Sequence, residues 1–369
     1  MTHPAPVTTE LVLAALDQVN DPELHQSLTR LGMVENIRIC EANVAFDLVL
    51  TTSACPLKAK IQEDAKAAVQ AIPGVAQVEV SISGKTLAAK VPGREPLPGI
   101  KNIIAVSSGK GGVGKTTVSV NLACALQQRG ARVGILDADI YGPNVPLMMG
   151  LRQAKIKEQT EDGKLVLPVG HQVKVVSTAF FIQEDQPVVW RGPMLDKMIR
   201  DFMTRMDWGE LDYLVIDLPP GTGDAQLTIV QAAPLSGAII VTTPQEVAIL
   251  DSRKGLKMFA NAQIPVFGIV ENMSHYINQH GEREELFGTG GGKRAAEELG
   301  VPLLAEVPLV PRVRANADEG TPIVVGDPHN PAAQALMQVA DQVIAQICAQ
   351  GVAQRGEQPE STNPQPVAV

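Results

Sequence analysis

The sequence has 369 residues, of which 45% are hydrophobic and 19% are charged, and its formal net charge is −9. This balance is typical of a folded protein with one large or two modest domains around a buried core. The negative charge and an aromatic content of only 3% argue against broad nucleic-acid binding. No apolar stretch approaches the length of a membrane span, and the first residues lack the basic and apolar regions of a signal peptide. We therefore expect a cytoplasmic protein that binds neither nucleic acid nor a membrane.

Residues 1–83 have the pattern of a small α+β domain. The expected elements are a short helix from residue 10, strands over 33–40 and 44–50, a helix over 57–71 and a final strand over 75–82. Residues 84–99 are rich in proline and glycine, which predicts a flexible linker.

Cys55 is the residue of this domain that could carry chemistry. Ser53 before it suits a helix N-cap, and Pro56 after it suits the first helical turn. Exposed backbone N–H groups at such a position favour a thiolate and hence a metal or cluster ligand. The alternative is a half-buried cysteine that only fills space, which is also how we interpret Cys40, Cys124 and Cys348. The sequence contains no CxxC pair, and the absence of an export signal argues against disulfides.

The run from Gly109 to Thr116 matches the phosphate-binding pattern G-x-x-x-x-G-K-[ST]. It lies between an expected strand over 102–107 and an expected helix over 116–129, which is the context that such a loop requires. Glycines allow the backbone N–H groups to face an anion, and the helix N-terminus adds positive partial charge. The sequence therefore predicts that ATP or another nucleoside triphosphate binds here, with Lys115 on the β/γ-phosphates and the Thr116 hydroxyl on Mg²⁺. The predicted binding residues are Gly109, Lys110, Gly111, Gly112, Val113, Gly114, Lys115, Thr116 and Thr117.

From residue 100 to about 350, short apolar strands alternate with amphipathic helices. The expected strands cover 103–107, 132–136, 173–178, 213–218, 238–242, 266–270 and 303–307. This alternation predicts an α/β fold with a doubly wound, mostly parallel sheet, and a disordered tail over 351–369.

Polar residues follow several of these strands, where ligands bind in such sheets. Asp137 and Asp139 follow one strand, and they are expected to complete the Mg²⁺ shell and to orient the attacking water. Asp217 closes another apolar strand, as a Walker-B carboxylate does, before the glycine-rich segment 219–224. Asn272 follows a third, and its paired donor and acceptor could read an adenine edge.

The second lysine of the loop, Lys110, resembles that of the deviant Walker A motif of the MinD/ParA class of ATPases. Members of that class dimerise face to face around ATP. The resemblance implies that Lys110 stabilises the phosphates of a partner subunit, much as an arginine finger does. It also implies that Asp139 positions water and that Asp137 supports the switch.

Five further segments resemble the Mrp/ApbC iron–sulfur cluster carriers: 135–143, Trp190–Met194, 217–224, 270–274 and 287–292. The N-terminal region, with Asp21-Pro22-Glu23-Leu24 and the segment around Cys55, resembles the iron–sulfur assembly domain fused to many of them. The resemblance implies an ATP-hydrolysing homodimer that carries a [4Fe–4S] cluster to apoprotein clients.

One departure from the family pattern concerns the cluster ligands. The family places a CxxC pair just after Asn-Met-Ser, whereas this chain continues from Ser274 through His275 to His280 without cysteine. Histidines of a surface loop are the simpler interpretation of His275 and His280. Cys55 then remains as the candidate cluster ligand, with one sulfur for each subunit.

Two functions remain in competition. The first is an ATP-hydrolysing cluster carrier or scaffold, favoured by the fused N-terminal domain. The second is a MinD/ParA-like regulatory or partitioning ATPase without metal chemistry, favoured by the missing CxxC pair. A reductase like the nitrogenase iron protein would need paired cysteines in the ATPase domain, which are absent.

Overall fold

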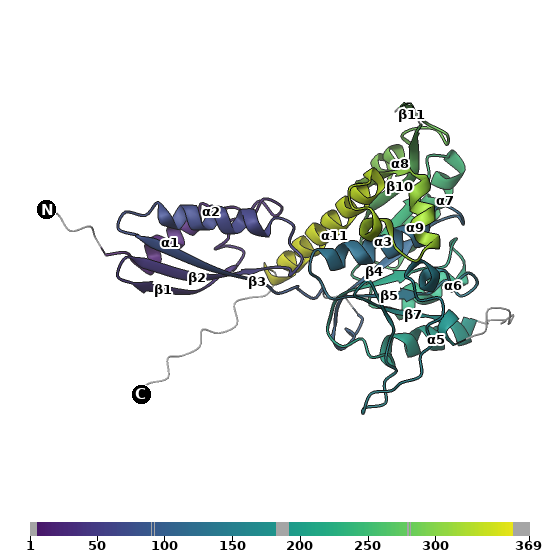
Figure 1. Cartoon of the computed structure of the whole chain (residues 1–369), viewed down its shortest axis with the longest axis horizontal. Helices are drawn as coiled ribbons and strands as arrows, with labels where there is room; N and C mark the ends of the chain where they lie inside the picture. Colours follow the sequence, from purple (N-terminus) through teal and green to yellow (C-terminus); the bar gives the residue numbers. More distant parts are fainter. Residues whose placement is uncertain are drawn as a thin grey trace. The chain divides into compact units, whose positions relative to one another are not determined.

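The computed structural model describes residues 6–89, 91, 93–181, 192–278, 280 and 282–356. Trp190 and Arg191, part of one family-like segment, lie outside the described residues, as does the chain beyond residue 356. The chain divides into two compact units (Figure 1): one holds the described residues up to 89 together with those from Ile344 onward, and the other holds Val91 to Val343. No helix in the described part of the chain is both long and apolar enough to cross a membrane.

The described residues of the smaller unit form a three-stranded sheet. Its elements are α1 (Thr9–Leu16), β1 (Val34–Cys40), β2 (Asn43–Leu50), α2 (Lys58–Gln70) and β3 (Gln77–Gly84). β1 pairs with β2 antiparallel, whereas β2 pairs with β3 in parallel, so α2 is the crossover. Burial at every fourth residue of α2, at Ile61, Ala65 and Val69, places one helix face on the core beneath Phe46. The predicted α+β class is confirmed.

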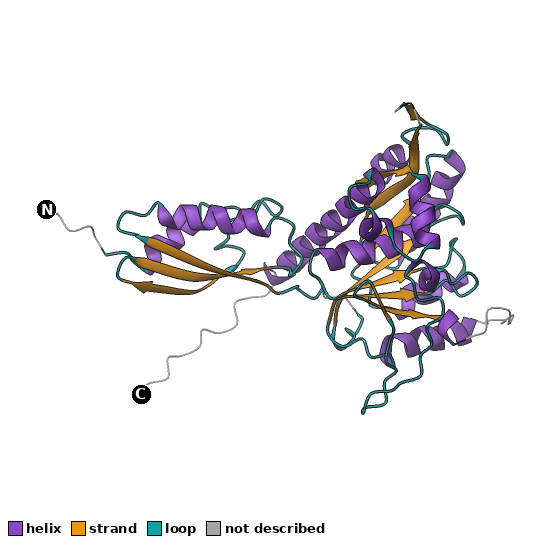
Figure 2. Ribbon diagram, in the orientation of Figure 1, coloured by secondary structure: helices purple, strands orange, loops and turns teal. Residues whose placement is uncertain are grey.

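The larger unit contains, in its described residues, a nine-stranded, mostly parallel sheet between helices (Figure 2). The strands are β4 (Ile100–Ser107), β5 (Val133–Asp137), β6 (Val169–Gly170), β7 (Val173–Ser177), β8 (Leu211–Asp217), β9 (Gly237–Thr242), β10 (Val266–Ile277), β11 (Arg283–Glu284) and β12 (Leu303–Leu309). The helices are α3 (Lys115–Gln128), α4 (Val145–Met148), α5 (Gly192–Thr204), α6 (Asp224–Ala232), α7 (Glu246–Asn261), α8 (Gly291–Leu299), α9 (Pro311–Asp318), α10 (Ile323–Gly326) and α11 (Pro331–Gly356).

The strand order β11-β10-β9-β4-β8-β5-β7-β6, with β12 also on β10, places β4 between β8 and β9. All seven predicted strands are present, and the doubly wound class is confirmed. Side chains of α5, α6, α7 and α8 share one hydrophobic core with the sheet. α3 contacts β4, β5 and β8 and is tied to α11 by a bidentate ion pair between Arg129 and Asp341.

The final helix corrects the prediction of a tail from residue 351. Residues 351–356 are helical. Val352 packs against the core of the smaller unit, and a Cβ on Gly351 would lie 2.8 Å from Leu87. Composition alone did not show these apolar contacts, because the segment is otherwise polar.

Each end of the segment 84–99 forms hydrogen bonds with its own unit. The N–H groups of Lys85 and Leu87 donate to the carbonyls of Leu50 and Thr51 in the smaller unit. In the larger unit, the Arg94 guanidinium donates to carbonyls at the end of α6.

An ion-pair cluster around the buried Asp212 joins β4 and β8 to Arg132, the residue before β5, at the end of the sheet opposite the phosphate loop. Asp212 is 3% exposed, and its carboxylate accepts from Lys101 Nζ at 2.7 Å and from the Arg132 side chain at 3.3 Å. Burial alone would raise the pKa of Asp212, but the hydrogen bonds from Arg132 and Lys101 outweigh it and lower this pKa to about 2.

We expect Asp212→Asn to lower the free energy of unfolding at pH 7 by about 2–4 kcal/mol, because it leaves two cations without their carboxylate. The depressed pKa means that the stabilisation by Asp212 is complete above about pH 4 and is lost as the pH falls towards 2. Urea unfolding of both proteins should therefore show a difference that shrinks over this range. The control is Asp207→Asn, which removes a partly exposed pair with Lys174 and should lower the free energy of unfolding by less than about 1 kcal/mol. An equal loss of unfolding free energy in the two variants would contradict the role assigned to Asp212.

Candidate active site

The loop between β4 and α3 has a conformation that only glycine adopts easily. Gly112 and Gly114 have φ of 81° and 85°, in the left-handed region. A Cβ on Gly114 would also lie 2.1 Å from Asn272 Nδ2, and a Cβ on Gly109 would lie 2.2 Å from the backbone of Asp251 in α7. The pattern of the loop thus has two physical causes, backbone conformation and close packing.

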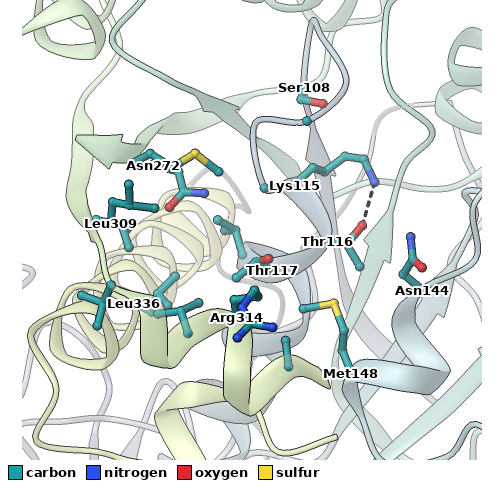
Figure 3. Close-up of a pocket in the computed structure, with 18 of the residues that line it drawn as sticks. Ser108, Lys115, Thr116, Thr117, Asn144, Met148, Asn272, Leu309, Arg314 and Leu336 are labelled. Atoms are coloured by element: carbon teal, nitrogen blue, oxygen red, sulfur yellow. Dashed lines mark hydrogen bonds between the residues drawn. The ribbon is translucent and has the colours of Figure 1, made fainter. Parts of the chain in front are cut away.

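A cavity of about 470 Å³ opens beside this loop (Figure 3). The loop and the start of α3 line it with Ser108, Gly111, Gly112, Gly114, Lys115, Thr116, Thr117 and Val118. Apolar side chains of α4, β12 and α9, together with Leu336 of α11, line another part. The cavity therefore combines an anion-binding loop with an apolar space beside it.

Lys115 and Thr116 converge on Asp217 at the end of β8. Lys115 Nζ lies 2.9 Å from Asp217 Oδ1, and the Thr116 hydroxyl donates to Asp217 Oδ2 at 2.7 Å. Asp217 is fully buried and also accepts from the Ser119 hydroxyl at 2.6 Å. A hydroxyl beside a carboxylate is the oxygen pair that a magnesium–nucleotide site uses, so the residues present fit this ion.

Asp137 and Asp139, at the end of β5, occupy different environments. Asp139 lines the cavity, 3.7 Å from Lys115 Nζ, whereas Asp137 is fully buried and accepts from the Ser177 hydroxyl at 3.0 Å. Burial and the negative charge of Asp217 raise the pKa of Asp137 well above its usual value. Burial also raises the pKa of Asp139, against the opposing charge of Lys115. Asp139 is therefore the carboxylate that can reach a ligand, and Asp137 lies behind it.

Asn272 lies in the wall of the cavity, and its amide nitrogen is already engaged. Asn272 Nδ2 donates to the Val113 carbonyl at 2.8 Å, so one of its two N–H groups holds the loop, and the side chain keeps its oxygen and its second N–H for a ligand. Met273 beside it has φ of 54°, at a point where the pairing of β10 with β12 shifts register.

Lys110 differs from the other loop residues. It is exposed, and it is not among the described residues that line the cavity. Its ammonium group is free to reach outward from the subunit.

The region that follows Met273 contains no thiol and continues β10. Ser274 is buried, and its hydroxyl donates to the Val307 carbonyl at 3.2 Å and lies 2.8 Å from His275 Nδ1. Burial lowers the pKa of His275. Across the part of the chain that the structure describes, no three His, Cys, Asp or Glu side chains gather to hold a metal ion. His275 and His280 are thus not brought together with further ligands.

The surroundings of Cys55 correct one expectation and add a residue that sequence reasoning missed. α2 begins at Lys58 with Leu57 as its N-cap, and the Ser53 hydroxyl pairs with Thr86 instead. Cys55 therefore lies in the turn before the helix and is half-buried. Burial raises the pKa of the Cys348 thiol of α11 to about 12, and this side chain hydrogen-bonds Thr51, four residues before Cys55. Its spacing along the chain gave no signal of this proximity.

Other residues of the cavity were also missed. Val307 to Leu309 end β12, where the rule that ligands bind at the ends of parallel strands would have identified them, and Val310, Val313 and Arg314 follow on the way into and along α9. The Ser108 hydroxyl is buried and has no hydrogen-bond partner among the described residues.

The glycine-rich segment 287–292 has a packing role. A Cβ on Gly291 would lie 2.3 Å from the Pro244 carbonyl, and the Gly292 N–H at the start of α8 donates to the buried Glu271 carboxylate.

Comparison with known proteins agrees with this geometry. Residues 99–344 match the family model described as NUBPL iron-transfer P-loop NTPase, and residues 9–82 match that of an iron-sulfur cluster assembly protein. An iron-sulfur cluster carrier protein from Synechocystis sp. is 51% identical over 92% of this chain and 98% of its own length. A nucleotide-binding protein from Archaeoglobus fulgidus, solved in complex with ADP, is 40% identical with a TM-score of 0.55 over 61% of this chain and 88% of that one. The septum site-determining protein MinD from Pyrococcus horikoshii, complexed with Mg-ADP, is 26% identical with a TM-score of 0.51 over 66% and 95% of the two chains.

Substitution of the loop glycines should separate the two constraints on this loop. Gly114→Ala combines a left-handed backbone with a clash on Asn272, so we expect the melting temperature to fall by about 4–10 °C. The Cβ of Gly112→Ala would meet no neighbour, so this variant has only the cost of placing alanine in a left-handed backbone conformation. We therefore expect a smaller fall in melting temperature. Gly111→Ala, whose Cβ would lie 3.9 Å from Pro220, serves as the control. Thermal unfolding without nucleotide measures the series, and a Gly114→Ala protein as stable as Gly111→Ala would refute this account.

Proposed function

The chain belongs to the family of NUBPL-type iron-transfer P-loop NTPases, and we propose that it hydrolyses ATP and carries iron–sulfur clusters to apoproteins. The observation that carries the proposal is the convergence of Lys115 and Thr116 on Asp217 beside the cavity, in a chain whose N-terminal unit matches an iron-sulfur assembly domain. The carrier protein named among its relatives supports the same function.

Hydrolysis would use residues already in place around the loop. Lys115 would exchange its contacts with Asp217 and Asp139 for the β- and γ-phosphates, which carry more charge. Thr116 and Asp217 would hold Mg²⁺, which neutralises phosphate charge when bound. Asp139, which faces the cavity, would orient the attacking water, and Asp137 would hold the end of β5 in position.

We further propose that ATP closes a homodimer through the face that carries Lys110. Exposed apolar side chains lie on the elements next to the loop, among them Val247 and Leu250 of α7. Gly109 packs on the same helix, at Asp251. Burial of these side chains against a second copy would bring Lys110 to the partner's phosphates. We also propose a cytoplasmic location for this protein.

For the cluster, we propose Cys55 and Cys348 as ligands. Both belong to the smaller unit, where the Cys348 side chain hydrogen-bonds Thr51, four residues before Cys55. Two thiols in each subunit would give a homodimer the four thiolates that a [4Fe–4S] cluster takes. Iron binding would displace the proton of the buried Cys348 thiol, because ligation requires the thiolate. The MinD/ParA-like regulatory alternative keeps the ATP-dependent dimer and needs neither thiol.

The two lysines of the loop should have separable roles. We expect Lys115→Ala to abolish ATP binding, because no other loop side chain carries charge into the cavity. Lys110→Ala should bind ATP normally but lose about 10²-fold or more of its hydrolysis rate, because the transition-state charge is no longer neutralised across the dimer. Binding is measured by equilibrium titration and hydrolysis by phosphate release. Unchanged turnover in Lys110→Ala would remove the proposed role in the partner's site.

Anaerobic reconstitution with iron and sulfide tests the cluster ligands. The unaltered protein should take up iron and develop a visible iron–sulfur absorption band, and Cys55→Ala and Cys348→Ala should each lose most of it. The control is Cys40→Ala, an exposed cysteine of the same unit, which should reconstitute normally. A band of equal stability in Cys55→Ala would show that the ligands lie elsewhere. No iron uptake by the unaltered protein would favour the regulatory alternative.

A further inference from the structure

One face of α9 forms a wall of the nucleotide cavity. Val313, Arg314, Ala317 and Asp318 all line it, as does Val310 just before the helix. These positions recur at the three- and four-residue spacing of a single helical stripe, so the helix presents a continuous surface to the cavity. Arg312, on the same helix, is exposed but is not among the described residues that line the cavity.

Arg314 and Asp318 add charge to an otherwise apolar part of the cavity. Arg314 Nη1 lies 2.6 Å from Asp318 Oδ2, and their side chains are 78% and 58% exposed. In Figure 3, the Arg314 side chain extends into the space bounded by Thr117, Met148 and Leu336. The contact with Asp318 offsets part of its charge and favours one orientation of the guanidinium, weakly because both side chains are exposed.

A nucleotide bound with its phosphates on the loop must place its base in the rest of the cavity. The loop already meets the phosphates with backbone N–H groups and with Lys115. Arg314, whose charge is partly offset by Asp318, is poorly suited as a further phosphate ligand. A planar guanidinium held beside apolar walls is instead well suited to stack on an aromatic ring.

We infer that Arg314 is a nucleotide-positioning residue that stacks on the nucleobase, and that Asp318 orients its guanidinium. This inference rests on the proposed nucleotide site and concerns the base, to which sequence analysis had assigned only Asn272. Because Asn272 Nδ2 is held by Val113, its oxygen can meet one edge of the base while Arg314 covers a face.

The test compares ligands with and without a base on the full chain. Binding is measured by equilibrium titration with ATP, ADP and inorganic tripolyphosphate, each in the presence of Mg²⁺. The proteins compared are the unaltered chain, Arg314→Ala, Arg314→Lys and Arg312→Ala. We expect Arg314→Ala to weaken the binding of ATP and of ADP by about 3- to 30-fold. The affinity for tripolyphosphate should change by less than about 2-fold. Arg314→Lys keeps the charge but not the planar group, so it should lose most of the same affinity. Arg312→Ala removes an arginine of the same helix outside the cavity and should match the unaltered protein.

The alternatives give different results. If Arg314→Ala weakens the binding of tripolyphosphate and of ATP equally, Arg314 contacts a phosphate and the stacking role is overturned. ATP affinity unchanged in both Arg314 variants would remove Arg314 from the site altogether. If the unaltered protein binds neither ATP nor ADP, the proposed nucleotide site itself fails. Far-ultraviolet circular dichroism checks that each variant is folded, and Arg314→Lys replaces Arg314→Ala if the alanine variant is not.

Discussion

The fully buried carboxylate of Asp217 is the interaction on which the rest of the site depends. Burying a charge is costly unless it is paired and hydrogen-bonded, and here Lys115, Thr116 and Ser119 satisfy it. All three belong to α3, whereas Asp217 ends β8, so the pairing fixes the first turn of the helix on the sheet. β8 lies beside β4, and the loop that joins β4 to α3 is thereby held at both of its ends.

Two further contacts connect the loop with its surroundings. The Asn272 side chain, in the middle of β10, donates to the Val113 carbonyl, and the Gly221 N–H of the segment before α6 donates to the Ser108 carbonyl at 3.0 Å. The first contact is made from within β10 and the second from the segment that follows β8. A ligand that alters the loop therefore acts directly on these two segments, one of which leads into the β10–β11 hairpin.

The positions of the thiols in this chain differ from the family pattern. At the site of the usual CxxC pair, the Ser274 hydroxyl bonds to the β12 backbone and continues the sheet. Cys55 and Cys348 instead share the smaller unit, although 293 positions separate them in the sequence. α11 makes this possible, because its last turns, with Val352, pack on the core of that unit.

Local patterns by themselves determined the phosphate loop, the alternation of strands and helices and the carboxylates after β5 and β8. Each depends on neighbours in sequence: glycine conformation, apolar periodicity and the geometry of strand ends. Tertiary structure decided which groups remain available. Asn272 is engaged by Val113, Asp137 is buried behind Asp139, and Cys348 joins the unit that holds Cys55. α9 likewise joins the site only because β12 pairs with β10. Such contacts join distant segments through packing, and packing leaves no periodic signal in the sequence.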